Sequence, residues 1–112
     1  MREHADVLND VLAAISHPKR RAIIAGLAAE GPTRFTDVAK PLNVNLNAVT
    51  KHLKLLNKAG LITRDKRGRE VYIMLQPEPL KIVARYIHPY ERFWNERLDT
   101  FQRNFKRINK KK

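Results

Sequence analysis

The chain has 112 residues and no cysteine; 43% of its residues are hydrophobic, 30% are charged, and 23 basic against 11 acidic residues give a formal net charge of +12. This size fits one domain, the hydrophobic content excludes general disorder, and the lack of cysteine excludes disulfides and thiolate metal sites. The basic excess favours a polyanionic partner, with nucleic acid ahead of a membrane surface. No apolar run approaches the about 18 residues of a membrane span, and residues 1–10 lack the apolar region of a signal peptide, so we expect a cytoplasmic protein with no membrane partner.

Two helices are predicted near the N-terminus. Residues 5–15, ADVLNDVLAAI, place hydrophobic side chains at helical spacing with polar side chains opposite. The pattern restarts in SHPKRRAIIAGLAAEG, where Pro18 suits the first helical position and Gly31 ends the helix. Either Ser16 or His17 can cap this second helix.

Two further helices joined by a short turn have the proportions of a helix-turn-helix over residues 36–58. In TRFTDVAKPLNVN, Thr36 is the expected N-cap of a short helix that Pro41 limits. Asn45 then caps a fourth helix, which Gly60 stops. Three of its side chains are spaced to face the core: Val49, Leu53 and Leu56.

The pattern changes to alternation in residues 61–76. Residues 70–75, EVYIML, alternate between two faces, and Arg67 with Gly68 form the expected turn of a two-stranded hairpin. Four basic side chains surround that turn, relieved only by Asp65: Arg64, Lys66, Arg67 and Arg69. Such a basic tip either contacts the DNA backbone or minor groove, or is simply solvated. The predicted fold is mainly α with a small β-hairpin wing, a winged helix-turn-helix.

A long apolar series occupies residues 79–108 and predicts one or two amphipathic helices, with a kink or restart at Pro89. Its members are mostly three or four residues apart: Leu80, Val83, Ile87, Tyr90, Trp94, Leu98, Phe101, Phe105 and Ile108. Residues 103–112 carry six basic residues and no acidic residue. The basic tail, residues 109–112, is either frayed and solvated or in contact with phosphate.

The start of the fourth helix carries a group of short polar side chains that a purely structural helix does not need. In a helix-turn-helix the second helix enters the major groove, and its early outward residues meet base edges. Asn45, Asn47, Thr50 and Lys51 suit this role, because their side chains can bind adenine, thymine, guanine or phosphate. His52 could contact phosphate or complete the packing. Taken singly, Asn45 can be an N-cap alone, and Lys51 and His52 can be merely solvated.

These motifs together resemble the ArsR family of winged-helix transcriptional repressors over nearly the whole chain. The matching segments are HPKRRAIIAGL, TDVAKPLNVNLNAVTKHLKLLNKAGLI and GREVYIML. The resemblance implies a DNA-contacting wing at Arg67 and Arg69, to which the basic neighbour Lys66 adds. It also implies a recognition-helix surface formed by Asn45, Leu46, Asn47, Thr50, Lys51 and His52. Leu46 stands where many members have glutamine.

The first and last helices, residues 1–15 and 79–108, are expected to form a homodimer, because their large apolar residues exceed what one small domain can bury. The segment LQPEPLKIVARYIHPYERFWNERLDTF resembles a family subgroup with a C-terminal dimerisation helix, which would include Phe93, Trp94, Arg97 and Leu98. The full expected interface consists of Val7, Leu8, Val11, Leu12, Tyr90, Phe93, Trp94, Leu98 and Phe101. Two-fold symmetry would place two recognition helices about 34 Å apart, which predicts an inverted-repeat operator.

Metal-sensing members of the family use cysteines near the segment matched by residues 36–44, or paired acids and histidines on the last helix. This chain has no cysteine, and His88 with Glu91 supplies only two side chains, too few for a zinc shell. Ser16 and His17 are sequence neighbours rather than a nucleophile with its base, and no glycine-rich phosphate loop occurs. We therefore expect no cofactor, no obligatory metal and no enzymatic activity.

The sequence favours one domain, residues 1–112, that acts as a homodimeric, metal-independent repressor on an inverted repeat in double-stranded DNA. The alternative is an architectural protein that binds DNA without sequence preference through the same winged helix and the tail at residues 110–112. A third hypothesis is a zinc-responsive switch through His88 and Glu91.

Overall fold

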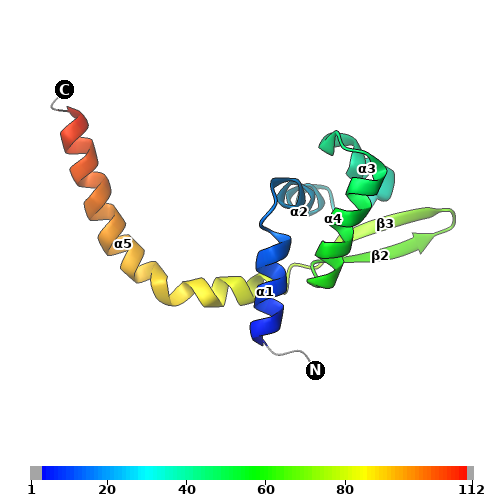
Figure 1. Ribbon diagram of the computed structural model, residues 1–112, viewed down its shortest axis with the longest axis horizontal. Coiled ribbons are helices and arrows are strands. Elements are labelled where there is room, and N and C mark those ends of the chain that lie inside the picture. Colours follow the sequence, from blue (N-terminus) through cyan, green and yellow to red (C-terminus); the bar gives the residue numbers. More distant parts are fainter. Residues whose placement is uncertain (1–3, 111–112) are drawn as a thin grey trace.

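The computed structural model describes residues 4–110, with side chains described for residues 5–105. The elements are α1 His4–Ala14, α2 Pro18–Glu30, β1 Thr33–Arg34, α3 Phe35–Ala39, the 3-10 helix η1 Lys40–Leu42, α4 Leu46–Lys58, β2 Ile62–Arg67, β3 Glu70–Leu75 and α5 Leu80–Lys110. Helices α1 to α4 gather beside the base of the β2–β3 hairpin, and α5 runs away from them to the opposite end of the molecule (Figure 1). The mainly helical fold with a small β wing agrees with the sequence prediction.

The helix ends follow the predicted capping residues. His17 caps α2, because its Nδ1 accepts the Lys19 backbone N–H at 3.0 Å, so of the two candidate caps the histidine is used. Asn45 caps α4 through its side-chain oxygen, which accepts the backbone N–H of Ala48 at 2.8 Å. Gly60 adopts a φ of 75° and ends α4, a conformation that glycine reaches without a Cβ penalty.

The first helix of the helix-turn-helix begins two residues earlier than the predicted N-cap implied. Helix α3 starts at Phe35, and Arg34 occupies the N-cap position without a side-chain cap bond, so the assignment of Thr36 as N-cap was wrong. The reason is that β1 ends at Arg34 and the chain passes directly from strand to helix. The turn into α4 contains Asn43 in the left-handed region, with a φ of 52°, which asparagine tolerates better than most residues.

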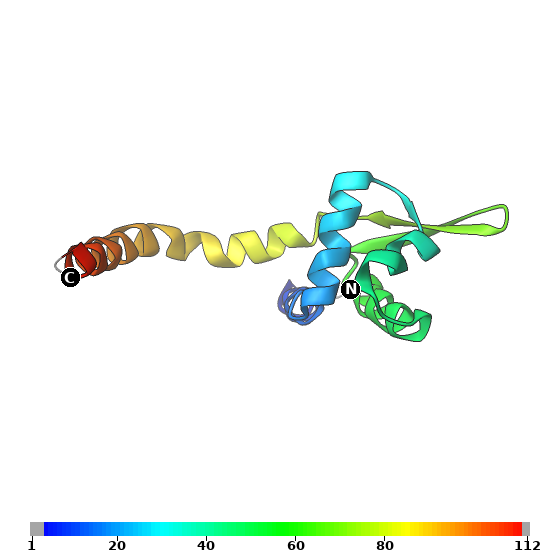
Figure 2. The same cartoon turned by 90° about the horizontal axis from the view of Figure 1, so that it is seen from above.

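The wing sheet has three antiparallel strands in the order β1-β3-β2, one more than predicted. The missed strand is β1, which pairs Thr33 with Ile73 and is too short to show a period of two. Because β2 and β3 pair Arg67 with Glu70, the loop consists of Gly68 and Arg69, one residue later than predicted. Figure 2 shows the hairpin tip extending past the helices.

The core lies between the helices and the base of the sheet. The inward residues of α4 are all fully buried, as their spacing predicted: Val49, Leu53 and Leu56. Val11 of α1 is also fully buried within the protomer, which corrects its assignment to the dimer interface. The cause is that α1 packs against both α4 and α5, so one side of α1 is already covered. Leu12, the next residue, is 39% exposed and remains available for contact with a second protomer.

Helix α5 is one continuous helix of 31 residues with Pro89 inside it. The predicted kink is present, because the helix bends between its yellow and orange parts in Figure 1, and proline removes a helical hydrogen bond and crowds the preceding turn. Leu80 and Val83 pack on the core, whereas every side chain in residues 88–105 is exposed. None of the described helices combines the length and the hydrophobicity that a membrane-spanning helix needs. Two parts of the predictions lie outside the described part of the chain: residues 111 and 112 of the predicted tail, and residues 1–3 of the first predicted dimerisation helix.

Candidate nucleic-acid interface

The outward face of α4 is polar and basic. Asn47, Thr50 and Lys51 are exposed there, on the opposite side from the buried Leu53. Lys54 is exposed on the same face, three residues after Lys51, and extends the basic surface by one turn. The sequence-based site did not include Lys54, although its spacing from Thr50 and Lys51 could have identified it.

Some polar groups in the first turn of α4 make hydrogen bonds within the helix, and others remain free to contact DNA. The Asn45 amide oxygen is used by the N-cap bond, which leaves the amide N–H groups for an outside partner. The Thr50 hydroxyl donates to the Leu46 carbonyl at 2.9 Å, so its oxygen can still accept and its methyl group can contact a base. The Leu46 side chain is 53% exposed beside Asn47 and offers an apolar contact in the same region.

His52 faces into the protein rather than outward. Its Nδ1 lies 3.2 Å from Nη1 of Arg20, and its ring centroid lies 4.7 Å from that of His17. The side chain is half-buried, whereas Lys51 beside it is exposed. Of the two roles considered for His52, the geometry favours packing over a phosphate contact.

A hollow separates α4 from the wing. It is lined by residues of α3, α4, β2, β3 and the hairpin loop: Phe35, Thr36, Thr50, Arg64, Arg69, Glu70 and Val71. Arg64, Arg69 and the Thr36 hydroxyl line this hollow and can donate to a phosphate oxygen, with the Glu70 carboxylate beside them. The Thr50 hydroxyl already donates to Leu46. Arg64 was counted in the sequence only as part of the basic hairpin, because the contact of this hairpin with α4 is not a local feature.

The basic side chains on the two faces of the wing differ in whether a neighbouring side chain pairs with them. Successive side chains of a strand alternate, so Arg64 and Lys66 share the side of the buried Ile62, and Arg67 points to the other side. There the Arg67 Nε lies 3.0 Å from the Asp65 carboxylate, and its guanidinium stands 4.6 Å from the centre of the Tyr72 ring. Lys66 and Arg69 thus carry their charge without a described ion pair, whereas Arg67 is held by two neighbours.

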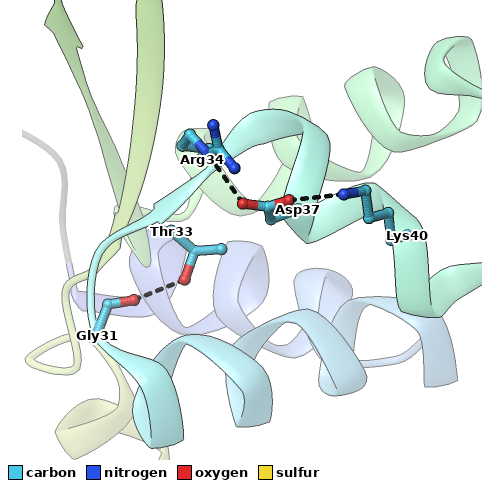
Figure 3. A network of polar contacts seen from close by, with 5 residues as sticks. All are labelled: Gly31, Thr33, Arg34, Asp37 and Lys40. Carbon is cyan, nitrogen blue, oxygen red and sulfur yellow. Dashed lines mark hydrogen bonds and ion pairs between the residues drawn. The ribbon is translucent and has the colours of Figure 1, made fainter.

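Asp37 forms ion pairs with residues on either side of it along the chain, at the start and the end of α3 (Figure 3). Its carboxylate lies 3.0 Å from Nε of Arg34 and 3.2 Å from Nζ of Lys40. The hydrogen bond from Arg34, followed by that from Lys40, holds the pKa of Asp37 below its ordinary value of 3.8, and the same contact raises the pKa of Arg34. The carboxylate therefore stays ionised and fixes α3, which forms one wall of the hollow.

The candidate metal ligands of α5, His88 and Glu91, do not gather further ligands from the described side chains. His88 Nδ1 and Glu91 Oε2 form an exposed pair 3.5 Å apart on α5. Within residues 5–105, whose side chains the structure describes, no group of three or more histidine, aspartate or glutamate side chains could hold an ion. A structural or sensory zinc site requires about four ligands, so this pair alone is insufficient.

Comparisons with known proteins agree with this arrangement. A family described as a helix-turn-helix domain matches residues 15–65. The chain is similar to the transcriptional repressor SdpR of Bacillus subtilis, with 31% identity over 74 residues, which are 66% of this chain and 81% of that protein. It is 35% identical over 74 residues to the HTH-type transcriptional repressor SmtB of Mycobacterium tuberculosis, covering 66% of this chain and 54% of that protein. The crystal structure of the ArsR family transcriptional regulator RHA00566 superposes with a TM-score of 0.74 at 28% identity, covering 85% of this chain and 97% of that one.

Proposed function

Because the chain belongs to the ArsR family of winged helix-turn-helix transcriptional regulators, which bind DNA and are not enzymes, we propose that it is a homodimeric repressor of the metal-independent kind. Its operator is an inverted repeat in double-stranded DNA. The observation that carries the proposal is the combination of a basic, exposed face on α4 with an uncovered apolar face on α5.

The two kinds of DNA contact come from different side chains. Asn47 and Thr50 read base edges in the major groove, where an amide can pair with adenine and a threonine methyl can meet thymine. Lys51 and Lys54 lie at the edge of this face and contact phosphates. The wing contacts the neighbouring DNA backbone through Lys66 and Arg69. Arg64 lines the hollow between the wing and α4. Arg67 is a weaker candidate, because Asp65 already pairs with it.

The partner of α5 is a second copy of the chain. Large apolar side chains that are between 41% and 65% exposed line this helix: Tyr90, Phe93, Trp94, Leu98, Phe101 and Phe105. Contiguous apolar surface of this kind marks an interface in a soluble protein. Val7, Leu8 and Leu12 of α1 lie beside the first part of α5 and extend the interface, since α1 and α5 pack on each other. A two-fold dimer would repeat the recognition helix at about one turn of DNA.

Selection of bound sequences from random duplex DNA at near-physiological salt tests this function. We expect a palindromic winner, bound on the order of 1,000-fold more tightly than a scrambled duplex. Binding with no enriched motif would contradict the repressor. It would favour the architectural alternative instead, which the net charge of +12 also supports.

Asn47→Ala is expected to weaken binding to the selected operator by about 1 to 3 kcal/mol and to leave binding to random duplex nearly unchanged, because it removes base-edge hydrogen bonds. Lys66→Ala is the matched control, since a phosphate contact is lost equally on every sequence. It should weaken both duplexes alike and lower the slope of log Kd against log salt by about one. Titrations at several salt concentrations measure both effects. Equal losses of affinity for operator and random DNA in Asn47→Ala would mean that Asn47 contacts the DNA backbone and not base edges.

A further inference from the structure

Arg20 is a charged side chain buried inside the protein, with 9% of its surface exposed. Its Nε donates to the Ala14 carbonyl at 2.6 Å and its Nη2 to the Ala13 carbonyl at 3.0 Å. Both carbonyls belong to the last turn of α1, where the helix dipole favours a cation. The remaining nitrogen, Nη1, faces Nδ1 of His52 on α4. One guanidinium therefore joins the α1 end, its own helix α2 and the recognition helix.

The geometry requires an unprotonated Nδ1 on two histidines. Arginine has only donors, so the His52 Nδ1 at 3.2 Å must accept the hydrogen bond from Nη1 of Arg20. The His17 Nδ1 accepts the backbone N–H of Lys19 at 3.0 Å and thereby caps α2. The two rings lie 4.7 Å apart between centroids, tilted by 51°. A proton on either Nδ1 would set donor against donor and would bring a positive imidazolium next to the other ring.

We propose that Arg20 and His52 position the recognition helix against α1 and α2 while the His52 ring is neutral, and that protonation of His52 releases the helix and weakens DNA binding. This inference rests on the proposed DNA-binding function. It assigns to His52 a positioning role, without contact to DNA. A histidine that contacted phosphate would behave in the opposite way, because protonation would then strengthen binding.

The charges around His52 all oppose its protonation. Burial first, and then the electrostatic effect of the basic neighbours His17, Arg20 and Lys19, holds the pKa of His52 below its ordinary value of 6.5. These basic groups come from α2 and its cap. Helix α1 faces the cluster with the carbonyls of its last turn and with the Ser16 hydroxyl that follows. Since the folded arrangement binds the proton less readily than the released one, its stabilisation is complete above pH 6.5. It is lost as the pH falls through 6.5 towards the lowered pKa.

The test is the affinity for the selected operator between pH 8.0 and pH 5.5 at constant ionic strength, followed by fluorescence anisotropy. The wild-type protein is expected to lose between about threefold and tenfold in affinity on acidification. His52→Asn places an amide oxygen on Cγ, where the histidine carries Nδ1, so it can accept the Arg20 bond and does not titrate. It should bind normally at pH 8.0 and lose most of the pH dependence. His88→Asn is the matched control, because His88 is exposed on α5, and it should keep the wild-type profile.

Affinity that is constant or rises on acidification would overturn the inference, as would a His52→Asn protein with the wild-type pH profile. A protein without sequence preference even at pH 8.0 would contradict the proposed function instead. The positioning role then remains testable in the free protein by the imidazole nitrogen chemical shifts of His52. At pH 8.0 we expect the proton on Nε2; a proton on Nδ1 would overturn the inference.

Discussion

Replacing both Trp94 and Leu98 with glutamate is expected to convert the proposed dimer to a monomer and to lower operator affinity by about 100-fold or more. Both side chains lie on the uncovered apolar face of α5, where Trp94 is 41% and Leu98 is 52% exposed. Two-fold symmetry would bring four carboxylates into one apolar interface, and burying unpaired charges costs several kcal/mol. The loss of affinity follows because each half-site then binds independently, without the high effective concentration that linkage provides.

Sedimentation equilibrium and operator titration measure the two parts of this prediction. The control is the pair Asn95→Glu and Gln102→Glu, which adds the same charge on α5 at positions off the apolar stripe. That protein should remain dimeric. The protomer itself should stay folded in both cases, because residues 88–105 contribute no buried side chain. A Trp94 and Leu98 double variant that stays dimeric would place the interface elsewhere.

Leu53→Ala is expected to lower the free energy of unfolding by about 2 to 5 kcal/mol. Leu53 lies in the middle of α4 and is fully buried, so the truncation leaves a cavity among close-packed neighbours. Helix propensity does not explain such a loss, since alanine is the stronger helix former. Such a loss would be a large share of the stability of a small domain.

Urea unfolding at a fixed protomer concentration measures this effect, because dimerisation makes apparent stability depend on concentration. Leu55→Ala is the control on the same helix. Leu55 is 42% exposed, and its truncation should change stability by less than about 1 kcal/mol. Equal losses at the two positions would contradict the assignment of the α4 stripe as the centre of the core.

The sequence alone determined the local structure because each signal acts over a few residues. Asn45 begins α4 through a bond to an amide three residues on, and Gly60 ends it through its own backbone conformation. The spacing of Val49, Leu53 and Leu56 identified the buried side of α4, and therefore also the side that faces outward. The outward polar and basic residues of the candidate interface followed from this one pattern.

Contacts between distant segments were decided only by the tertiary structure. His52 and Arg20 are 32 residues apart, so no local pattern shows that the ring turns inward. The pairing of β1 with β3, the burial of Val11 under α4 and α5, and the hollow between Arg64 and Thr50 arise in the same way. A single sequence records which side chains are apolar or charged. Packing decides which of these side chains come into contact. It places an apolar residue in the core or in an interface, and it leaves a cation in solvent or brings it to a buried partner.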